Sequence, residues 1–304
     1  MTPFFSVVVP VYNRARVLGA ALASVLTQSE QDFEIVVVDD GSTDDPRATV
    51  AACADPRLRL IRQDNRGGGA ARNTAIREAR GRFIAFLDSD DVFLPHHLAA
   101  MRRLLEGTTA TAGYAPVIVD RGDGRRLVKP PRALGPGEDM GEYLLCDRGF
   151  VPTSTTVVPA ALAKVTLYHE DLREAEDTDF AIRLALAGCA FAMAAAPGAV
   201  WTDRFDPGRS SAARSSARLA NWLDAMKPRL TAKAWRGGRG WAGAKGVALR
   251  APLRALAYYL SAVAHGCYGP KLAAIVFLQI FLPDRAYRAL ADRAIGRAAV
   301  PAPC

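Results

Sequence analysis

In the first third of the chain, apolar stretches rich in β-branched residues alternate with segments whose apolar residues recur at helical spacing. The predicted strands cover residues 5–11, 34–38, 58–61 and 83–87. The first intervening segment carries one apolar helical stripe, made of Val17, Leu18, Ala21, Leu22, Val25 and Leu26. Further helices are expected from about Gly69 to Arg80 and after Pro95. Strands that alternate with helices predict an α/β fold with a mostly parallel sheet flanked by helices.

The pattern loosens in the middle of the chain. Residues 108–149 are rich in Pro, Gly and charged side chains, and Arg121–Gly124 is typical of a hairpin turn. We expect a variable, substrate-facing region there. Regular structure resumes at Thr153–Val158 and in a helix over about 177–187, for which Gly188 is a suitable C-cap.

The last third contains a long apolar stretch. Between Ala255 and Leu282 the only potentially charged side chains are His265 and Lys271. Glycines and Pro270 interrupt this stretch, whereas a membrane-spanning helix needs about 20 continuous apolar residues. We expect two helices in or on a membrane interface; a spanning or re-entrant hairpin and soluble packed helices are the alternatives. The expected basic anchors are Arg250, Arg254, Lys271, Arg285 and Arg288.

Charge divides the chain. Of 304 residues, 50% are hydrophobic and 23% charged, which permits a sizeable core and excludes a disordered chain. Residues 1–203 hold 22 Lys+Arg against 27 Asp+Glu, a net of −5, whereas residues 204–304 hold 17 against 4, a net of +13. We therefore expect an α/β domain at 1–205 and a basic, apolar helical tail at 206–304 that meets an anionic membrane surface. Nucleic acid fits less well, because the tail's apolar residues are aliphatic and clustered, without the interleaved aromatics that stack on bases.

The cysteine residues and the N-terminal segment indicate the cellular compartment in which the protein is expected. The cysteines are Cys53, Cys146, Cys189, Cys267 and Cys304. They are odd in number, far apart and without CxxC spacing, which predicts a reducing compartment and no zinc site. Met1 leads into Phe4–Val9 with neither a basic n-region nor a small-residue cleavage site, so this segment is interpreted as a strand. We expect a cytoplasmic protein.

Polar segments follow the first two predicted strands, at the sheet edge where open parallel sheets bind ligands. The first is Pro10–Arg14, PVYNR, where an ordinary turn capped by Asn13 is the alternative. The second, which begins at Asp39-Asp40, is an abrupt pair of carboxylates able to accept a ring N–H or a ribose hydroxyl. Helix capping by Ser42 or Asp44 would explain the Ser and Thr there, but not the two adjacent aspartates.

Two more polar segments follow the third and fourth strands. Asn65–Asn73 is a glycine-rich turn that enters a helix and brings Arg72 towards negative charge; a flexible loop is the alternative. Asp88-Ser89-Asp90-Asp91 places three carboxylates within four residues. Such crowding is costly without a cation, and oxygen-only ligands suit Mg²⁺ or Mn²⁺. Helix capping would use only one of these carboxylates.

In this order the segments resemble the family-2 inverting glycosyltransferases of the GT-A fold. The resemblance covers about residues 4–190. It rests on PVYNR, VVDDGSTDD, NRGGGAARN, the Asp88-Ser89-Asp90 element, and Glu176–Phe180 with Arg183. It implies a Rossmann-like, mixed and mostly parallel sheet and a nucleotide-sugar donor, with UDP as the expected nucleotide.

The resemblance also implies roles for individual residues. Pro10, Tyr12, Asn13, Asp39, Asp40, Arg72 and Asp88 would contact the nucleotide. Asp90, with Asp88, would hold Mg²⁺ or Mn²⁺ on the diphosphate. Asp177 matches the general base and Asp179 is the rival, while an acidic first turn that complements the helix dipole is the structural alternative. Many relatives place a basic residue and a His after the catalytic helix; here Arg204 could reach phosphate, and no His is present.

A single base and a metal would give direct displacement with inversion at the anomeric carbon. The basic tail suggests a lipid-linked or membrane-associated glycan acceptor, such as a surface-polysaccharide precursor, and attachment to the inner face of the cell membrane. Two other functions remain open: a catalytically degenerate, membrane-attached binding protein and a nucleotidyltransferase. The latter should show a glycine-rich basic loop after the first strand, which PVYNR is not.

Overall fold

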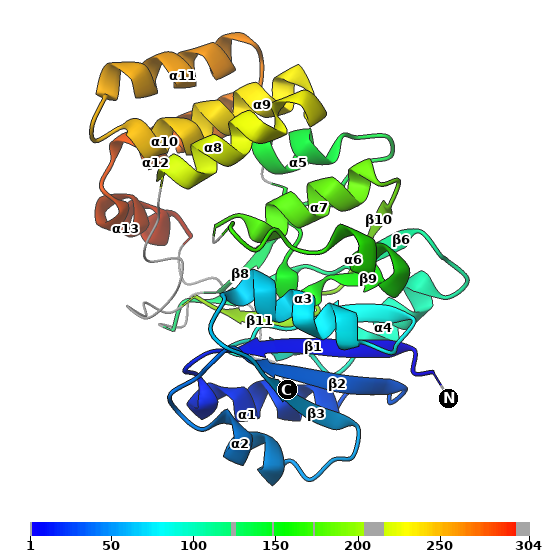
Figure 1. Cartoon of the computed structure of the whole chain (residues 1–304). Helices are drawn as coiled ribbons and strands as arrows, with labels where there is room; N and C mark the ends of the chain where they lie inside the picture. Colours follow the sequence, from blue (N-terminus) through cyan, green and yellow to red (C-terminus); the bar gives the residue numbers. More distant parts are fainter. Residues whose placement is uncertain (1, 123–125, 148, 173, 204–215, 296–304) are drawn as a thin grey trace. The chain divides into compact units, whose positions relative to one another are not determined.

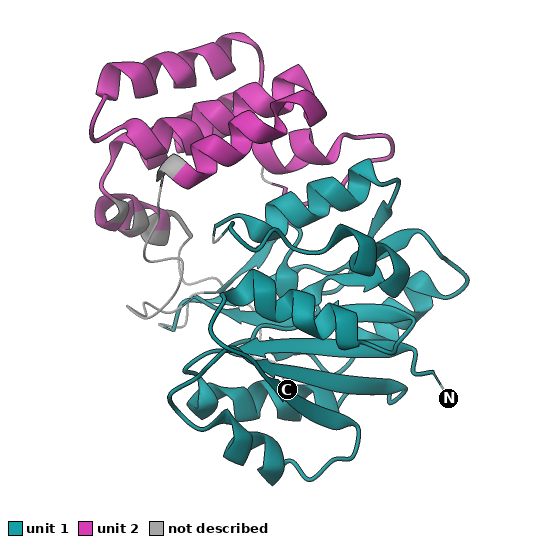
Figure 2. Cartoon of the chain, viewed as in Figure 1, with its two compact units in different colours: residues 1–130, 151–204, 300–304 teal, residues 131–150, 205–299 magenta. Residues whose placement is uncertain are grey.

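The computed structural model describes residues 2–122, 126–147, 149–172, 174–203 and 216–295. These residues form two compact units (Figure 2). The first comprises residues up to 130 and from 151 onward to 203; the second comprises 131–150 and the described residues from 216 to 295. The segment 131–150 thus joins the C-terminal helices, whereas the sequence had suggested a division at residue 205.

A seven-stranded sheet forms the centre of the first unit, in the order β10-β6-β9-β4-β1-β2-β3. Its strands are β1 (Phe5–Val11), β2 (Phe33–Asp39), β3 (Leu58–Arg62), β4 (Phe83–Phe86), β6 (Thr111–Tyr114), β9 (Val157–Pro159) and β10 (Ala190–Met193). β1 runs parallel to β2 and β4, while β9 is antiparallel to β4 and β6. The mixed, mostly parallel GT-A sheet predicted from the sequence is confirmed.

Burial explains why the central strands are continuous apolar runs. Every residue of β1 except Pro10 is buried, and all of β2 is buried. Helices cover both faces, so neither face shows the polar alternation of a solvent-exposed strand. Figure 1 shows α1 (Ala15–Leu26) and α2 (Pro46–Ala52) on one side of β1–β3 and α3 (Gly68–Glu78) on the other. The remaining helices of this unit are α4 (His97–Leu105), α6 (Ala160–Thr166) and α7 (Glu176–Leu186).

The strand register aligns the polar segments. Val11, the last residue of β1, pairs with Asp39, and Asp39 in turn pairs with Arg62 of β3. On the other side of β1, the amide of Leu87 donates to Val8. The residues that follow β1, β2, β3 and β4 therefore leave the sheet at the same edge.

A second, four-stranded sheet in the first unit was not predicted. Its order is β5-β11-β7-β8, with β5 (Val92–Phe93), β11 (Ala199–Thr202), β7 (Val117–Asp120) and β8 (Arg126–Lys129). β7 and β8 are antiparallel, as a hairpin predicts, although residues 123–125 of the connection between them lie outside the described residues. The region that looked irregular in the sequence thus contains three short strands and one short helix. These elements were not predicted because they carry too few residues to show a clear period.

The second unit is helical. It contains α5 (Met140–Cys146), α8 (Ser216–Met226), a 3₁₀ turn (Lys227–Arg229), α9 (Ala232–Gly238), the π-helical η4 (Arg239–Gly243), α10 (Ala244–Val247), α11 (Pro252–Ala264), α12 (Pro270–Phe281) and α13 (Asp284–Ile295). The predicted break between two apolar helices is present between α11 and α12. None of the helices in the described ranges combines the length and apolar character needed to cross a bilayer.

Candidate active site

The turn after β1 presents one exposed ring and one structural asparagine. Tyr12 is 46% exposed, which leaves its ring accessible for stacking. Asn13 has a φ of 51°, in the left-handed region that asparagine tolerates. Its side-chain oxygen accepts hydrogen bonds from the amide (2.7 Å) and hydroxyl (3.1 Å) of Thr43. Asn13 therefore ties this turn to the one after β2, and Pro10 lies half-buried just before it.

Asp39, the last residue of β2, is buried and fixes the start of the next loop. One carboxylate oxygen accepts the amide of Ser42 at 2.8 Å. The other accepts Arg62 Nη1 at 2.6 Å, and Arg62 also donates to the carbonyl of Ser42. Asp39 is thus held in place by groups on both sides.

Asp40 shapes the glycine-rich loop. Its Oδ1 accepts the side-chain amide of Gln63 (2.7 Å) and the backbone amide of Arg66 (3.0 Å). Its Oδ2 accepts the amide of Gly67 at 2.8 Å and no other hydrogen bond from the described residues, and a carboxylate oxygen can accept a second bond. Gly67 has a φ of 93°, which favours glycine at this position. Asp40 therefore organises the loop and retains acceptor capacity.

Arg72, on α3, joins the end of β4 to the start of α7. Its Nη2 donates to Asp88 at 2.5 Å, and its Nη1 lies 3.5 Å from a carboxylate oxygen of Glu176. The guanidinium also lies 5.3 Å from the ring centroid of Tyr168. Burial alone would lower the pKa of Arg72, but the charges of Asp88 and Glu176 raise it well above its ordinary value. Nε and Nη1 have no hydrogen-bond partner among the described residues.

The three aspartates after β4 have different surroundings. Asp90 pairs with Arg14 Nη1 at 2.7 Å. Asp91 is buried and accepts the hydroxyl of Ser154 (2.5 Å) and the amide of Thr202 (3.0 Å), which anchors the end of β11. Burial, followed by the charges of Asp88 and Asp90, raises the pKa of Asp91 well above its ordinary value. Asp91 therefore has a structural role, because it connects the end of β11 to Ser154. Asp88 and Asp90 instead pair with arginine side chains.

The donor set of Asp88 and Asp90 fits a hard divalent cation. Each carboxylate is now paired with a guanidinium, so the position already accommodates positive charge. The described residues contain no group of three or more His, Cys, Asp or Glu side chains arranged to hold a metal. Mg²⁺ in nucleotide sites commonly takes one or two carboxylates, with phosphate oxygens and water completing its coordination. These two residues could therefore hold the metal together with a bound diphosphate.

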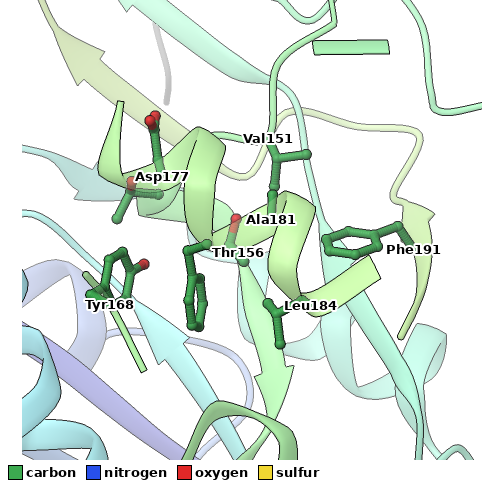
Figure 3. Close-up of a pocket in the computed structure, with 9 residues that line it drawn as sticks. Val151, Thr156, Tyr168, Asp177, Ala181, Leu184 and Phe191 are labelled. Carbon is green, nitrogen blue, oxygen red and sulfur yellow. The ribbon is translucent and has the colours of Figure 1, made fainter. Parts of the chain in front are cut away.

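A small pocket lies beside the first turn of α7, with Asp177 at its edge (Figure 3). The other lining residues are Val151, Thr153, Thr156, Tyr168, Phe180, Ala181, Leu184 and Phe191. The residue before the helix, Ala175, has a φ of 56°, which is strained for a residue with a Cβ. Asp177 is half-buried, and most of the side chains that line the pocket are apolar.

Asp177 titrates differently from an exposed aspartate. Burial, and then the neighbouring charge of Glu176, raise the pKa of Asp177 to about 6. The amide of Thr178 donates to one of its oxygens at 2.7 Å and opposes this shift. A carboxylate with a pKa near the working pH is suited to accept a proton from a hydroxyl.

Asp179 is engaged elsewhere. It is buried and pairs with Arg183 one turn later, at 2.7 Å to Nε and 2.6 Å to Nη2. The same arginine donates to the carbonyl of Thr166 at the end of α6. This ion pair joins α6 to α7.

Several contacts were missed from the sequence. Arg14 and Glu176 belong to recognised motifs, so their positions could have suggested the pairs with Asp90 and Arg72. Tyr168 lies in a loop before α7, and no sequence signal placed it at the pocket. The expected diphosphate contact Arg204 lies outside the described residues. His97 is a core residue: its ring packs 4.5 Å from that of Phe93, and burial lowers its pKa to about 3.

Similarity to solved structures covers nearly the whole chain. S. aureus TarS 1–349, in a crystal structure with UDP-GlcNAc, aligns with a TM-score of 0.66 and 20% identity over 96% of this chain and 90% of TarS. The mannosyltransferase PcManGT of Pyrobaculum calidifontis, in complex with GDP-Man and Mn²⁺, aligns with a TM-score of 0.58 and 20% identity over 97% and 85%. At this identity the alignments establish the GT-A fold.

Sequence relatives extend the comparison. The amylovoran biosynthesis glycosyltransferase AmsB of Erwinia amylovora is 31% identical over 75% of this chain and 79% of AmsB. WfgD of Escherichia coli, a UDP-Glc:alpha-D-GlcNAc-diphosphoundecaprenol beta-1,3-glucosyltransferase, is 42% identical over 31% of this chain and 37% of WfgD. An uncharacterized glycosyltransferase of Rickettsia conorii is 32% identical over 55% of this chain, which spans only 27% of that protein. A model of glycosyl transferase family 2 matches residues 6–160. The chain therefore belongs to glycosyl transferase family 2.

Proposed function

We propose that this glycosyltransferase moves a sugar, with inversion, from a nucleoside-diphosphate donor to the hydroxyl of a lipid-linked or membrane-associated glycan. The observation that carries the proposal is the chain of contacts from Asp88 through Arg72 to Glu176, next to Asp177. Glu176 directly precedes Asp177, the carboxylate suited to accept a proton. Through Arg72, Glu176 is connected to Asp88, one of the two candidate metal ligands. Donor activation and proton removal would then occur in adjoining parts of one site.

The nucleotide would lie along the carboxyl edge of the sheet. Exposed Tyr12 can stack on the base, and Asp40 Oδ2 can accept a ring N–H while it holds the glycine-rich loop. Asn13 and Asp39 position the loop after β2 by accepting the backbone amides of Thr43 and Ser42. UDP is the proposed nucleotide; WfgD uses UDP-Glc and the TarS structure contains UDP-GlcNAc, which supports it.

Asp88 and Asp90 would hold Mg²⁺ or Mn²⁺ against the diphosphate. When bound, the ion supplies Lewis-acid stabilisation of the charge on the departing nucleoside diphosphate. Arg72 remains charged in its buried position and adds a fixed positive charge beside Asp88. The pair between Arg14 and Asp90 would have to loosen for Asp90 to act as a ligand.

Asp177 would accept the proton of the acceptor hydroxyl as that oxygen attacks the anomeric carbon. Attack opposite to the leaving group inverts the configuration, and no covalent enzyme intermediate is required. The engagement of Asp179 by Arg183 supports Asp177 over Asp179 as the base.

The acceptor class rests on the relatives and on charge. AmsB acts in amylovoran biosynthesis and WfgD on a diphosphoundecaprenol-linked sugar, which supports a role in surface-polysaccharide synthesis. Residues 216–295 hold 13 Lys+Arg against three Asp+Glu, which supports attachment of the second unit to an anionic membrane surface. We place the protein on the cytoplasmic face of the cell membrane as a peripheral protein.

Calorimetry with UDP, GDP and dTDP, each with Mn²⁺ and with chelator, tests the donor site. We expect one nucleotide to bind in a metal-dependent manner, and Asp90→Ala to abolish that dependence. Asp171→Ala, which removes an exposed carboxylate of the same unit, is the control and should bind as wild type does. Absence of binding to all three nucleotides would reject the donor site and favour a degenerate binding protein.

A further inference from the structure

Three basic side chains of the second unit gather on two aromatic rings. The guanidinium of Arg239 lies 5.0 Å from the ring centroid of Trp235 and 4.4 Å from that of Tyr258. Lys227 Nζ lies 4.6 Å from the Trp235 ring, and the guanidinium of Arg254 lies 5.4 Å from the Tyr258 ring. The residues come from the 3₁₀ turn after α8, from α9 and η4, and from α11. We call Lys227, Arg239 and Arg254 the basic cluster.

Two members of the basic cluster converge on one oxygen atom. Arg239 Nη2 donates to the hydroxyl oxygen of Tyr258 at 2.9 Å, and Arg254 Nε donates to the same oxygen at 2.6 Å. These hydrogen bonds and the two positive charges lower the pKa of Tyr258. A neutral phenol cannot offset two guanidinium charges that lie this close together, so the arrangement favours an added anion.

The protein supplies no such anion within the described ranges. Arg132 and Lys233 of the same unit pair with carboxylates, whereas no member of the basic cluster does so in the described part of the chain. The indole N–H of Trp235 is also buried without a hydrogen-bond acceptor among those residues. Guanidinium groups bind phosphate oxygens with matching geometry, and stacking on aromatic rings holds them ready to do so.

Exposed aliphatic side chains occur on and just before α11, the helix that carries Arg254. Leu253, which precedes Arg254 on α11, is 82% exposed, and Leu260 on the same helix is 52% exposed. Leu249, just before α11, is fully exposed. A ligand with a phosphate group and a long apolar chain would match both features.

We propose that Lys227, Arg239 and Arg254 bind the phosphate group of a membrane lipid. This inference deepens the proposed membrane attachment and rests on it for the choice of a lipid, but it does not depend on the donor chemistry of the first unit. The phosphate could belong to a phospholipid headgroup or to the diphosphate that links a glycan to its lipid carrier. Both sources offer the same anionic oxygens, and the experiment separates them.

The test measures sedimentation of the full-length protein with three kinds of vesicle: phosphatidylcholine alone, phosphatidylcholine with phosphatidylglycerol, and phosphatidylcholine with a polyprenyl diphosphate at the same surface charge. The variant Arg239→Gln/Arg254→Gln should weaken binding to the two kinds of anionic vesicle about 30-fold, since each basic residue near an anionic surface contributes about 1 kcal/mol. The matched control Arg218→Gln/Arg229→Gln removes the same charge from exposed positions of the same unit, outside the expected basic anchors, and should weaken binding much less. Lys227→Gln, at an exposed position, provides a second test if the double variant fails to fold.

Equal weakening by the cluster and control variants would overturn the proposal, because the binding would then reflect only diffuse positive charge. If the wild-type protein binds neither kind of anionic vesicle, the proposal is also overturned. A loss confined to polyprenyl diphosphate vesicles identifies the lipid-linked diphosphate as the ligand, and a loss confined to phosphatidylglycerol vesicles identifies the phospholipid headgroup. An equal loss on both shows that the basic cluster binds either phosphate. UDP binding by the cluster variant should match wild type, which separates this site from the donor site.

Discussion

At the residue scale, the first turn of α7 carries two aspartates with different surroundings. Asp177 faces a largely apolar pocket, and its raised pKa reflects burial with little compensating positive charge. Asp179 has its charge offset by Arg183. Two residues of helical rotation therefore separate a carboxylate suited to accept a proton from one suited to hold two helices together.

Asp177→Asn should lower kcat by about 10²–10⁴-fold and leave donor affinity unchanged, because the amide cannot accept the acceptor's proton. Asp179→Asn is the matched comparison. It should instead lower the free energy of unfolding by about 3–5 kcal/mol, since it removes the buried charge that pairs with the partly buried Arg183. Steady-state kinetics and urea unfolding of both variants distinguish the roles. The assignment fails if Asp177→Asn turns over normally.

The pKa of Asp177 also predicts a pH dependence. A pKa raised to about 6 means that the carboxylate is ionised, and thus active as a base, only above that pH. We expect kcat/KM to fall about tenfold per pH unit below pH 6 and to level off above it. A pH–rate profile measures this, and the acidic limb should be missing from the residual activity of Asp177→Asn. A limb centred near the ordinary aspartate pKa would contradict the proposed environment.

At the element scale, glycines allow the helices of the second unit to pack closely. A Cβ atom on Gly237 of α9 would lie 2.3 Å from the sulfur of Cys146 and 2.9 Å from the carbonyl oxygen of Leu145. On Gly240 of η4 it would lie 2.4 Å from the Cβ of Ala262. This segment therefore contacts both α5 and α11 through its backbone, which explains why residues 131–150 belong to the second unit.

Gly237→Ala should destabilise the protein by about 1–3 kcal/mol, because the added methyl group has no space in this packed interface. Gly243→Ala is the control. Its Cβ would have no neighbour closer than 3.4 Å, and the nearest is a flexible arginine side chain, so we expect a neutral or slightly stabilising effect. Thermal unfolding of both variants tests the contrast. Equal destabilisation would show that packing at Gly237 is not the cause.

At the scale of the whole molecule, the excess of positive charge lies in residues 204–304, and most of the exposed large hydrophobic side chains of the described residues lie in the same part of the chain. Residues 255–280 form a core with Cys146 and Ala244, so truncation of the tail would remove part of that core as well as its charges. A salt series tests the electrostatic part of membrane binding without truncating the chain. We expect binding to anionic vesicles to weaken steeply as salt shortens the Debye length from about 10 Å at 0.1 M to about 3 Å at 1 M. Sedimentation across a salt series measures this, and salt-independent binding would point to purely apolar insertion.

Much of the first unit could be predicted from the sequence. The first strand has the predicted bounds, and α3 spans Gly68–Glu78 where a helix from about Gly69 was expected. These segments were readable because their side chains follow one local period and end in distinctive turns. The second sheet was not predictable, since β5 has two residues and pairs with β11 more than 100 positions later.

The sequence by itself determined the order of the first four long strands and the helices between them, the residues at the carboxyl edge of the sheet and the uneven distribution of charge, because each is a local property of the chain. Only the tertiary structure decided which of these residues meet. It joined Arg72 to Asp88 and Glu176, paired Arg14 with Asp90, and gathered the basic cluster from three separate elements. Such contacts depend on packing between distant segments, and pKa values and ligand sites depend in turn on those contacts.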